Sequence, residues 1–319
     1  MDLAVLENFD IVIDFEVPLS DFTTFRLGGI CPALLTCQTP EQLEKAIKFC
    51  RDKHIPFILI GGGSNLVVSD SGIDRYVIRY VSEAPLIERQ GCDITVSAST
   101  SLDELAKYAA ENGLQGLNCT TGIPGTVGGA IVGNAGAFGD QIGDVVKYIS
   151  VFDVNGVKKE LQNKELDFAY RHSVLKKTND IVVSARLSMI TGDQTSLLKE
   201  REEILSIRRA KHPDLPTTPC AGSFFRNVEP TSSAGKRQAA GWFLDKAGGK
   251  DLTSGGAQIF SKHANIIIKS QGCCAQDVYK LSKQMACLVK DKFGLDLIRE
   301  VRFVGKFDGM PVNITDVIW

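Results

Sequence analysis

Residues 56–65 read PFILIGGGSN, a short apolar run that leads into three successive glycines. An apolar run of this length, bounded by proline and glycine, predicts a buried strand. The glycines allow the backbone to turn so that successive N–H groups point at one anion, which suits a pyrophosphate. A tight structural loop is the alternative explanation for a glycine triplet taken alone. The stretch therefore predicts a strand followed by a candidate phosphate-binding loop.

Helices and strands alternate on either side of this stretch. Residues 39–42 read TPEQ, a capping box with proline at the first helical position, and apolar residues follow at helical spacing up to Cys50. Residues 93–99 alternate as a strand does, and a second capping box at residues 101–104 opens a helix that ends near Gly113. The pattern predicts repeated α/β units.

The second half of the chain continues this mixture. Residues 148–154 and 181–190 are predicted strands, and residues 194–211 form a predicted charged amphipathic helix that Pro213 stops. A further helix is predicted over residues 275–292, because its apolar residues fall on one face. The charged helix is therefore a plausible boundary between two parts of the chain.

A second glycine-rich region lies at residues 122–137. Residues 122–130 read GIPGTVGGA and residues 134–137 read NAGA. So many small residues allow the backbone to approach a large flat ligand closely. Neither glycine-rich region reads G-x-G-x-x-G or G-x-x-x-x-G-K-[ST], which disfavours a Rossmann or P-loop site. Two such regions predict a dinucleotide cofactor with a diphosphate and a ring system.

Composition excludes several functional classes. The net charge is -2, with 36 basic and 38 acidic residues, and this balance disfavours nucleic-acid or membrane-surface binding. No apolar run approaches the roughly 20 residues that a membrane helix needs, and residues 1–7 lack the basic start of a signal peptide. Nine scattered cysteines show no metal-ligand spacing. We expect a cytoplasmic protein without a structural metal.

Three short motifs hold reactive side chains that are unremarkable when taken alone. Residues 221–227 read AGSFFRN and place one hydroxyl, Ser223, between a glycine and two aromatic residues. No G-x-S-x-G elbow surrounds this serine, so a hydrolase nucleophile is disfavoured and a structural serine is the alternative. Charged residues such as those in Tyr170-Arg171 and Glu300-Val301-Arg302 are most often solvated or paired at the surface.

Taken together, the motifs resemble the UDP-N-acetylmuramate dehydrogenase family, also called UDP-N-acetylenolpyruvoylglucosamine reductase. The resemblance covers about residues 20–305, with the family's motifs in the family's order. They are TFRLGG at 24–29, GGGSNLVV at 61–68, GIPGTVGGAI at 122–131, NAGAFG at 134–139, YR at 170–171, AGSFFRN at 221–227, GGAQ at 255–258, HAN at 263–265 and EVRF at 300–303.

The short link between Arg171 and Ser223 leaves no space for the extra substrate-closing loop of one subtype, so the chain resembles the shorter second type. Four positions depart from the family's usual residues. They are Gly133, Phe138, Cys220 and Arg299.

The resemblance implies an α/β (α+β) fold of three domains. Residues 1–83 and 84–193 are the expected FAD-binding subdomains, in the fold of vanillyl-alcohol-oxidase-type flavoenzymes. Residues 194–305 are the expected UDP-sugar substrate-binding domain, and residues 306–319 are an expected tail.

The resemblance also implies a reaction. NADPH is the expected co-substrate, and FAD is expected to be bound non-covalently. UDP-N-acetylglucosamine enolpyruvate is the expected substrate, and its reduction gives UDP-N-acetylmuramate for peptidoglycan in the cell wall. We expect a monomer that binds neither nucleic acid nor a membrane.

Three residues match the family's catalytic groups. Reduction of the enolpyruvyl group leaves negative charge at C2 that spreads into the adjacent carboxylate. Arg171 is the expected partner of this carboxylate, because a guanidinium stays protonated and engages a carboxylate at two points. Glu300 is expected to assist at the same carboxylate, and Ser223 to protonate C2.

The remaining expected site residues are carried over from the same motifs. The residues expected at FAD are Arg26, Gly61, Gly62, Gly63, Ser64, Asn65, Gly122, Ile123, Pro124, Gly125, Thr126, Gly128, Gly129, Asn134, Ala135 and Gly136. The residues expected at the substrate are Tyr170, Asn227, Lys246, His263, Asn265 and Arg302. No metal site is expected.

Two other functions stay open at this point. A flavin oxidase of the same wider fold is one, although many such oxidases attach the flavin to a histidine in the first glycine-rich loop, where this chain has Ser64-Asn65. A flavin-binding protein that has lost the reaction is the other. The presence of arginine, serine and glutamate in all three motifs disfavours it.

Overall fold

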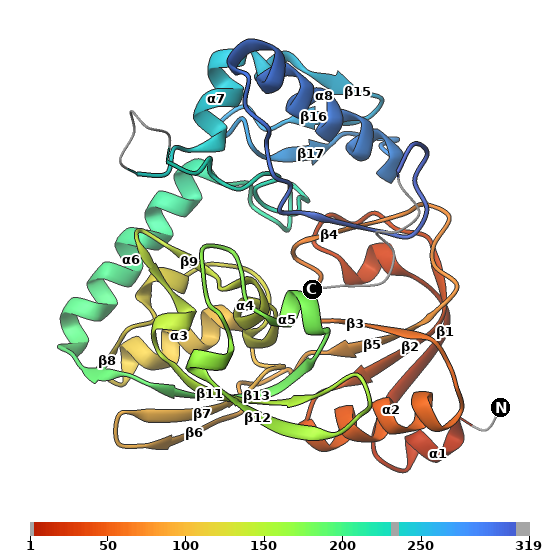
Figure 1. The fold of residues 1–319 in the computed structure, drawn as a ribbon, viewed down its shortest axis with the longest axis vertical. Helices are drawn as coiled ribbons and strands as arrows, with labels where there is room; N and C mark the ends of the chain where they lie inside the picture. Colours follow the sequence, from red (N-terminus) through yellow and green to blue (C-terminus); the bar gives the residue numbers. More distant parts are fainter. Residues whose placement is uncertain (1–2, 231–235, 311–319) are drawn as a thin grey trace.

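The computed structural model describes residues 3–230 and 236–310, so most of the expected tail, residues 311–319, lies outside the described part. Figure 1 shows two larger sheets at one end of the molecule and a smaller unit, which contains α7 (Ala240–Ala247) and α8 (Ala275–Phe293), at the other. The long helix α6 (Gln194–Lys211) runs along one side toward the smaller unit.

The first sheet has four strands. In spatial order they are β1 (Val12–Pro18), β2 (Ile30–Cys37), β5 (Tyr76–Tyr80) and β3 (Phe57–Ile60). Strands β2, β5 and β3 are parallel, and β1 pairs antiparallel to β2. The predicted strand at residues 57–60 is confirmed, and it ends at the first glycine-rich loop.

Helix α2 (Pro40–Asp52) packs on this sheet. Its predicted capping box is confirmed, because the side chain of Thr39 accepts from Gln42 N while Gln42 Oε1 accepts from Thr39 N. The short helix α1 (Ala4–Glu7) contacts α2.

The second sheet has five antiparallel strands. In spatial order they are β12 (Lys158–Gln162), β11 (Val146–Phe152), β13 (Ile181–Ser188), β7 (Asp93–Ser97) and β6 (Ile87–Gln90). The helices that accompany it are α3 (Leu102–Glu111), α4 (Val127–Gly133) and α5 (Leu175–Thr178). Ser101 caps α3 by accepting from Glu104 N, as the sequence predicts.

The third sheet is small and packs with α7 and α8 in the smaller unit. Its strands are β15 (Thr253–Ser254), β16 (Ala257–Ile259) and β17 (Ile267–Lys269). The predicted helices at 194–211 and 275–292 are confirmed as α6 and α8. Two further strand pairs join β8 (Leu114–Gln115) to β14 (Ile190–Thr191) and β9 (Gly136–Ala137) to β10 (Asp140–Gln141).

One parallel pair of strands joins the N-terminal part of the chain to its C-terminal part. Strand β18 (Arg302–Val304) lies beside β4 (Leu66–Val68), which follows the first glycine-rich loop. A second tie is the carboxylate of Asp70, whose oxygens accept from the backbone N of Ala275 at 2.9 and 2.8 Å at the start of α8. The C-terminal part is therefore anchored at two places to residues 66–70, the segment that follows the first glycine-rich loop.

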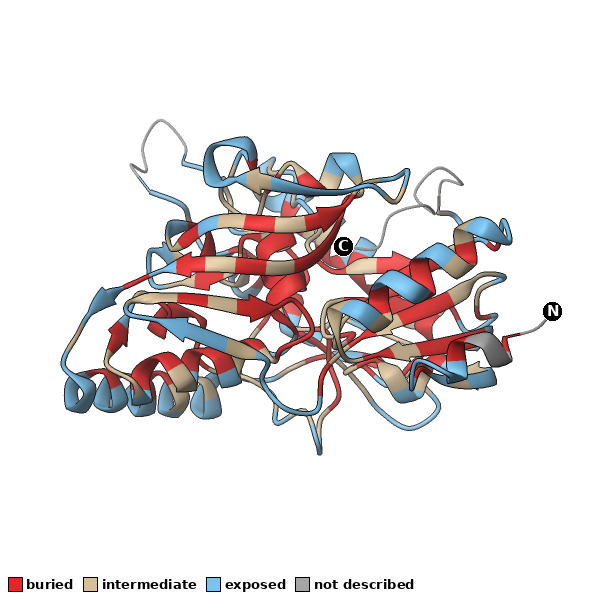
Figure 2. Ribbon diagram, turned by 90° about the horizontal axis from the view of Figure 1, so that it is seen from below, coloured by how far each residue is buried: buried red, intermediate tan, exposed pale blue. Residues whose placement is uncertain are grey.

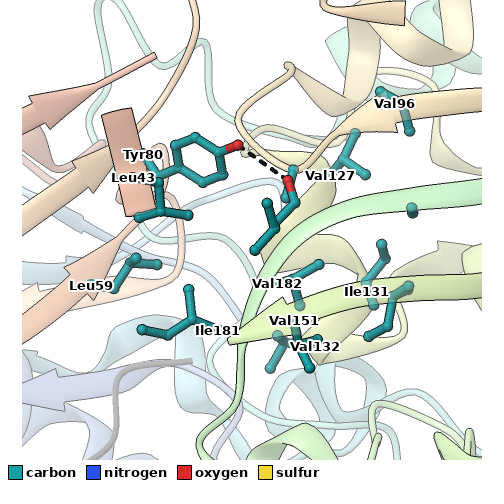
Figure 3. Close-up of a cluster of buried hydrophobic side chains, with 14 of the residues drawn as sticks. Leu43, Leu59, Tyr80, Val96, Val127, Ile131, Val132, Val151, Ile181 and Val182 are labelled. Carbon is teal, nitrogen blue, oxygen red and sulfur yellow. Dashed lines mark hydrogen bonds between the residues drawn. The ribbon is translucent and has the colours of Figure 1, made fainter. Parts of the chain in front are cut away.

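Buried side chains form one core across the first two sheets. Leu43, Leu59 and Tyr80 come from the first sheet and its helix, and they meet Ile181 and Val182 of the second sheet (Figure 3). The Tyr80 hydroxyl lies 2.8 Å from Ser97 Oγ and donates to the carbonyl of Val183 at 3.1 Å. The two sheets are therefore packed as one body.

The smaller unit has its own core, and Phe25, Leu27 and Val67 of the N-terminal part belong to it. Figure 2 shows buried residues along the strands and on the inner faces of the helices. The nine cysteines are free thiols, and five of them are buried. Within the described residues no helix is long and apolar enough to cross a membrane, and no three His, Cys, Asp or Glu side chains gather as a possible metal site.

Candidate active site

The two glycine-rich regions, far apart in sequence, lie against each other. A Cβ atom added to Gly62 would lie 3.3 Å from Gly125 Cα, and one added to Gly125 would lie 2.7 Å from Ser64 Oγ. Ser64 Oγ also donates to the carbonyl of Pro124 at 2.9 Å. Glycine suits both positions, because a Cβ on Gly62 would crowd Gly125 and because Gly125 adopts φ +122°, which side chains disfavour.

Both loops are held in place from outside. Gly63 adopts φ +62°, and a Cβ there would lie 2.1 Å from the carbonyl oxygen of Phe22. Gly122 N donates to Asp103 Oδ1 at 2.6 Å, and Asp103 in turn accepts from Arg201 of α6 at 2.8 and 2.9 Å. Burial acts against the charged form of Asp103, but Arg201 and the Gly122 amide hold the pKa of Asp103 below its usual value.

The loops fit a flavin dinucleotide. Thr126 caps α4, and a Cβ added to Gly61 would lie 2.5 Å from its Oγ1, so a side chain is excluded between the loops. The backbone of Gly129 is exposed, and a Cβ there would meet only Thr126 Oγ1 at 3.7 Å. A bound group can therefore approach the backbone at this point, as a large flat cofactor requires.

Some of the residues expected at FAD have structural partners as well. Asn134 is buried with φ 46° at the end of α4, where Nδ2 donates to the carbonyl of Ala169 at 2.9 Å and Oδ1 accepts from Gly143 N at 3.0 Å. The side chain of Asn134 therefore orders the turn that continues to Ala135 and Gly136.

Arg26 follows a segment that contacts the first glycine-rich loop, because Thr24 N donates to the carbonyl of Gly63 at 3.2 Å. Arg26 is exposed and lines a surface hollow of about 390 Å³ together with Ser20, Asp21 and Thr23. The carbonyl of Arg26 accepts from Lys269 Nζ at 2.6 Å.

Arg171 and Glu300 form an ion pair next to the second glycine-rich region. Arg171 Nε lies 2.9 Å from Glu300 Oε1, and both side chains are about one quarter exposed, 24% and 23%. Arg171 Nη2 also donates to the carbonyl of Gly136 at 3.0 Å. The predicted catalytic arginine is thereby linked to the second glycine-rich region and to the predicted catalytic glutamate.

The backbone around Glu300 joins two other predicted motifs. Glu300 N donates to the carbonyl of Phe224 at 2.8 Å, directly after Ser223. The carbonyl of Glu300 accepts from Asn65 Nδ2 at 3.1 Å, and Arg302 N donates to the carbonyl of Asn65 at 3.0 Å. The structure therefore brings the motifs of Asn65, Arg171, Ser223 and Glu300 together.

Ser223 lies at the edge of a cavity of about 240 Å³ in the smaller unit. Asn227, His263 and Asn265, three of the residues predicted to bind the substrate, also line it. The rest of the lining comprises Ala239, Gly241, Trp242, Asp245, Lys250, Lys262 and Ala264.

Lys246 does not line this cavity; it is exposed on α7, and its carbonyl accepts from Lys292 Nζ at 2.6 Å. Lys250 and Lys262 provide the lysines of the lining instead. Lys262 directly precedes the HAN motif, and that position is the signal by which it can be found. Lys250 lies outside every motif described above.

Two of the expected substrate residues also hold the backbone of the site. Asn265 is buried, and its amide pairs with the main chain of Phe225, accepting from N at 3.0 Å and donating to O at 2.8 Å. The Tyr170 hydroxyl accepts from Asn227 N at 3.2 Å, and Arg237 Cζ lies 4.2 Å from the centroid of the Tyr170 ring.

Histidine and cationic side chains surround the site. The rings of His212 and His263 lie 5.5 Å apart between centroids. Burial, with the nearby His263, lowers the pKa of His212 to about 4, and burial also lowers the pKa of His263. Burial and the charge of Arg226 lower the pKa of Arg302.

The four departures from the family's usual residues are accommodated locally. Arg299 stacks on Tyr279 and Phe303, with Cζ 5.5 and 5.1 Å from the ring centroids. Phe138 is exposed, and no atom lies within 4 Å of a Cβ built on Gly133. The carbonyl of buried Cys220 accepts from Thr24 Oγ1 at 2.7 Å.

Comparison with known proteins agrees with this arrangement. An FAD binding domain model matches residues 31–161, and the UDP-N-acetylenolpyruvoylglucosamine reductase, C-terminal domain, matches residues 214–304. The UDP-N-acetylenolpyruvoylglucosamine reductase of Lactobacillus acidophilus is 35% identical over 306 residues, which cover 96% of this chain and 99% of the relative. That of Heliobacterium modesticaldum is 36% identical over 297 residues, or 92% of this chain and 91% of the relative.

A solved structure is similar over a comparable length. The crystal structure of UDP-N-acetylenolpyruvylglucosamine reductase from Thermus caldophilus has a TM-score of 0.74 and 31% identity, and the match covers 92% of this chain and 98% of that one. The expected mixed α/β fold with an FAD-binding domain is therefore confirmed. From similarity over nearly its whole length, the chain belongs to the UDP-N-acetylenolpyruvoylglucosamine reductase family of flavin oxidoreductases.

Proposed function

We propose that this protein uses NADPH to reduce the enolpyruvyl group of UDP-N-acetylglucosamine enolpyruvate, giving UDP-N-acetylmuramate for peptidoglycan synthesis. The observation that carries the proposal is the Arg171–Glu300 ion pair, which lies between the glycine-rich loops and the Ser223 motif. Non-covalent FAD supplies the hydride chemistry when bound. We place the reaction in the cytoplasm and the protein as a monomer.

Arg171 is proposed to hold the substrate carboxylate. Its guanidinium is held by Glu300 on one side and by the Gly136 carbonyl on another, so its orientation is set before the substrate arrives. A preorganised cation stabilises the charge that develops in the transition state without a cost for reorganisation. The same charge, delocalised from C2 into the carboxylate, is what the reduction of an enolpyruvyl group creates.

Glu300 is proposed to act at the same carboxylate through its pair with Arg171. Its main chain is fixed by Asn65 on one side and Phe224 on the other, so the carboxyl group is carried by a rigid segment. Such support is what a site needs when its side chains must stay within a fraction of an ångström of the productive geometry.

Ser223 is proposed to hold the proton that C2 receives. It lines the 240 Å³ cavity, and the carbonyl of the next residue, Phe224, accepts from Glu300 N, so the backbones of the serine and glutamate motifs lie side by side. A serine hydroxyl is a weak acid, but positioning beside a strongly basic carbanion compensates.

The cavity is proposed to receive the UDP-sugar. Asn227, His263 and Asn265 line it together with Lys250 and Lys262. Lys262 suits a diphosphate, because an ammonium binds phosphate as a compact charge, whereas Lys250 pairs with Asp245 of the lining at 2.8 Å and would have to exchange that partner. Tyr170, Lys246 and Arg302 remain proposed contacts outside the lining of this cavity.

We also propose the three-domain division at 1–83, 84–193 and 194–305. The strands of the three sheets fall within residues 12–80, 87–188 and 253–269, which supports these limits. The first two sheets share one core across the boundary near residue 83, and a separate cluster that includes Leu34, Ile58 and Val77 belongs to the first sheet.

The deciding experiment measures NADPH oxidation by the purified, FAD-loaded protein in the absence of oxygen. Oxidation that requires the enolpyruvyl sugar, with UDP-N-acetylmuramate as the product, is the expected result. In a parallel assay with oxygen admitted, turnover of an alcohol that requires the oxygen would instead identify a flavin oxidase. A protein that binds FAD but oxidises no NADPH would identify a flavoprotein without this reaction, and either result overturns the proposal.

A further inference from the structure

Lys176 lies next to the backbone of Arg171 and belongs to none of the sequence motifs described above. It belongs to α5, five residues after Arg171, and its Nζ donates to the main-chain carbonyl of Arg171 at 2.7 Å. A hydrogen bond from an ammonium is charge-assisted, so it is stronger than one between neutral groups. Lys176 therefore touches the backbone of Arg171, whose side chain pairs with Glu300.

The backbone of Arg171 needs this support. Arg171 has φ 53°, in the left-handed region that side chains other than glycine and asparagine rarely adopt. Such a conformation is disfavoured and persists only where its surroundings enforce it. The same conformation aims the guanidinium so that it reaches both Glu300 and the Gly136 carbonyl.

The surroundings of Lys176 are strongly cationic. Burial first, and then the charges of Arg226, Arg302 and Arg171, lower the pKa of Lys176 to about 8, and the charge of Glu300 acts in the opposite direction. Nε of Arg226 is buried without a hydrogen-bond partner in the described structure. One carboxylate among several cations leaves the site short of negative charge, which an anionic substrate would supply.

We propose that Lys176 is a positioning residue, which fixes the left-handed backbone of Arg171 through its carbonyl and so aims the guanidinium at the substrate carboxylate. The inference rests on the proposed function for the identity of that carboxylate. The contact between Lys176 and Arg171 exists independently of it. In the proposed role, Lys176 touches neither the substrate nor the cofactor.

The test compares Lys176→Met, which removes the ammonium, with Lys176→Arg, which keeps a cation. Lys177→Met is the matched control, because Lys177 is the exposed neighbour on the same helix. Loss of a hydrogen bond from a charged donor predicts that kcat/KM for the enolpyruvyl sugar falls by about 10- to 100-fold in Lys176→Met. Lys176→Arg should recover part of the loss, and Lys177→Met should stay within about twofold of wild type.

The pH profile separates positioning from a general structural role. Because the pKa of Lys176 is about 8, its ammonium is present below that pH and lost above it. Wild-type kcat/KM should therefore decline as the pH rises through 8. The charged groups that act on Lys176 are Arg171, Arg226, Arg302 and Glu300. Lys176→Arg stays charged over this range, so its profile should not show the decline.

A crystal structure of Lys176→Met supplies a readout that does not depend on turnover. Arg171 should leave the left-handed region, or Nε should move out of ion-pair range of Glu300. An unchanged Arg171 overturns the inference, as do kinetics within threefold of wild type or a loss that Lys176→Arg does not recover in part. If Lys176→Met fails to fold, a decline near pH 8 that persists in Lys176→Arg overturns it.

These results also separate the two proposals. An inactive wild-type protein contradicts the proposed function, whereas the position of Arg171 in Lys176→Met still decides the role of the lysine.

Discussion

Asn65 reaches from the first glycine-rich loop to Glu300, with Nδ2 donating to the main-chain carbonyl of Glu300 at 3.1 Å. The carbonyl of Asn65 accepts in return from Arg302 N at 3.0 Å. These two bonds join the loop proposed to hold FAD to the segment that carries the proposed catalytic carboxyl. A change at Asn65 should therefore affect both cofactor and substrate chemistry.

Asn65→Ala tests this link. Removing the amide leaves the Glu300 carbonyl without its donor, and an unsatisfied partly buried acceptor costs about 1–3 kcal/mol. We expect about a tenfold weaker affinity for FAD, measured by flavin fluorescence, together with a lower kcat at saturating FAD. Asn155→Ala, at an exposed turn, is the control. A variant with weaker FAD binding but normal kcat would show that the loop and Glu300 act separately.

Ser223→Ala tests the proposed proton donor. Reduction of the bound FAD by NADPH requires no proton at C2 of the sugar, so stopped-flow absorbance should record it at close to the wild-type rate. Reoxidation by the enolpyruvyl sugar should slow by about 10²- to 10⁴-fold, the usual contribution of a positioned general acid. A slowing of less than tenfold would remove Ser223 from this role. Equal slowing of both steps would assign it to packing or cofactor placement.

Glu300→Gln tests the carboxyl group while preserving its shape. The amide retains contact with Arg171 but loses the charge, and hydrogen bonds to a charged group contribute about 1.5–3 kcal/mol. We expect turnover to fall by about 10- to 100-fold, with unchanged folding and FAD content measured by circular dichroism and absorbance. Glu88→Gln, at an exposed position of β6, is the control. Normal turnover at saturating substrates would make Glu300 a structural residue.

His212 should make the protein sensitive to acid. Its pKa is lowered to about 4 in the folded state by burial and by His263, against about 6.5 when unfolded. The unfolded chain therefore binds more protons between these values, and the free energy of unfolding decreases as the pH falls from about 6.5 toward 4, by at most about 3 kcal/mol from this group.

Urea unfolding of His212→Asn at pH 7 and pH 5 measures this contribution. The variant should lose less stability between the two pH values than wild type does, and His54→Asn, at an exposed position, should behave as wild type. Equal losses in wild type and His212→Asn would contradict the assignment.

Local patterns in the sequence predict the elements well where one physical cause dominates. The strand at residues 57–60 follows from an apolar run between proline and glycine, and α2 follows from the Thr39 capping box. The contact of Gly62 with Gly125 has no local signal, because it arises only when the two sheets pack. The motifs predict that both loops matter, but the packing shows why glycine is required there.

Individual side chains of the site are harder to predict. Asn134 and Asn265 lie in motifs, yet their amides bond to the backbone, and this use depends on which chain segments pass nearby. Lys250 and Lys262 line the cavity and Lys246 does not, and the spacing of the three lysines in the sequence does not indicate this difference. Lys176 has no motif, since its role depends on the backbone conformation of a residue five positions away.

Asp70 makes the C-terminal half of the chain depend on the N-terminal half. This dependence limits how freely the two halves can be exchanged between relatives. The carboxylate of Asp70 supplies the acceptors for the first amides of α8, at Ala275 and Gln276, and helix amides at that end have no partners within the helix. A chimera that joined residues 214–304 to the N-terminal half of another protein would need a carboxylate at the same place. Without it, α8, which packs against α7, would begin with amide donors that lack this acceptor, and the chimera should be less stable.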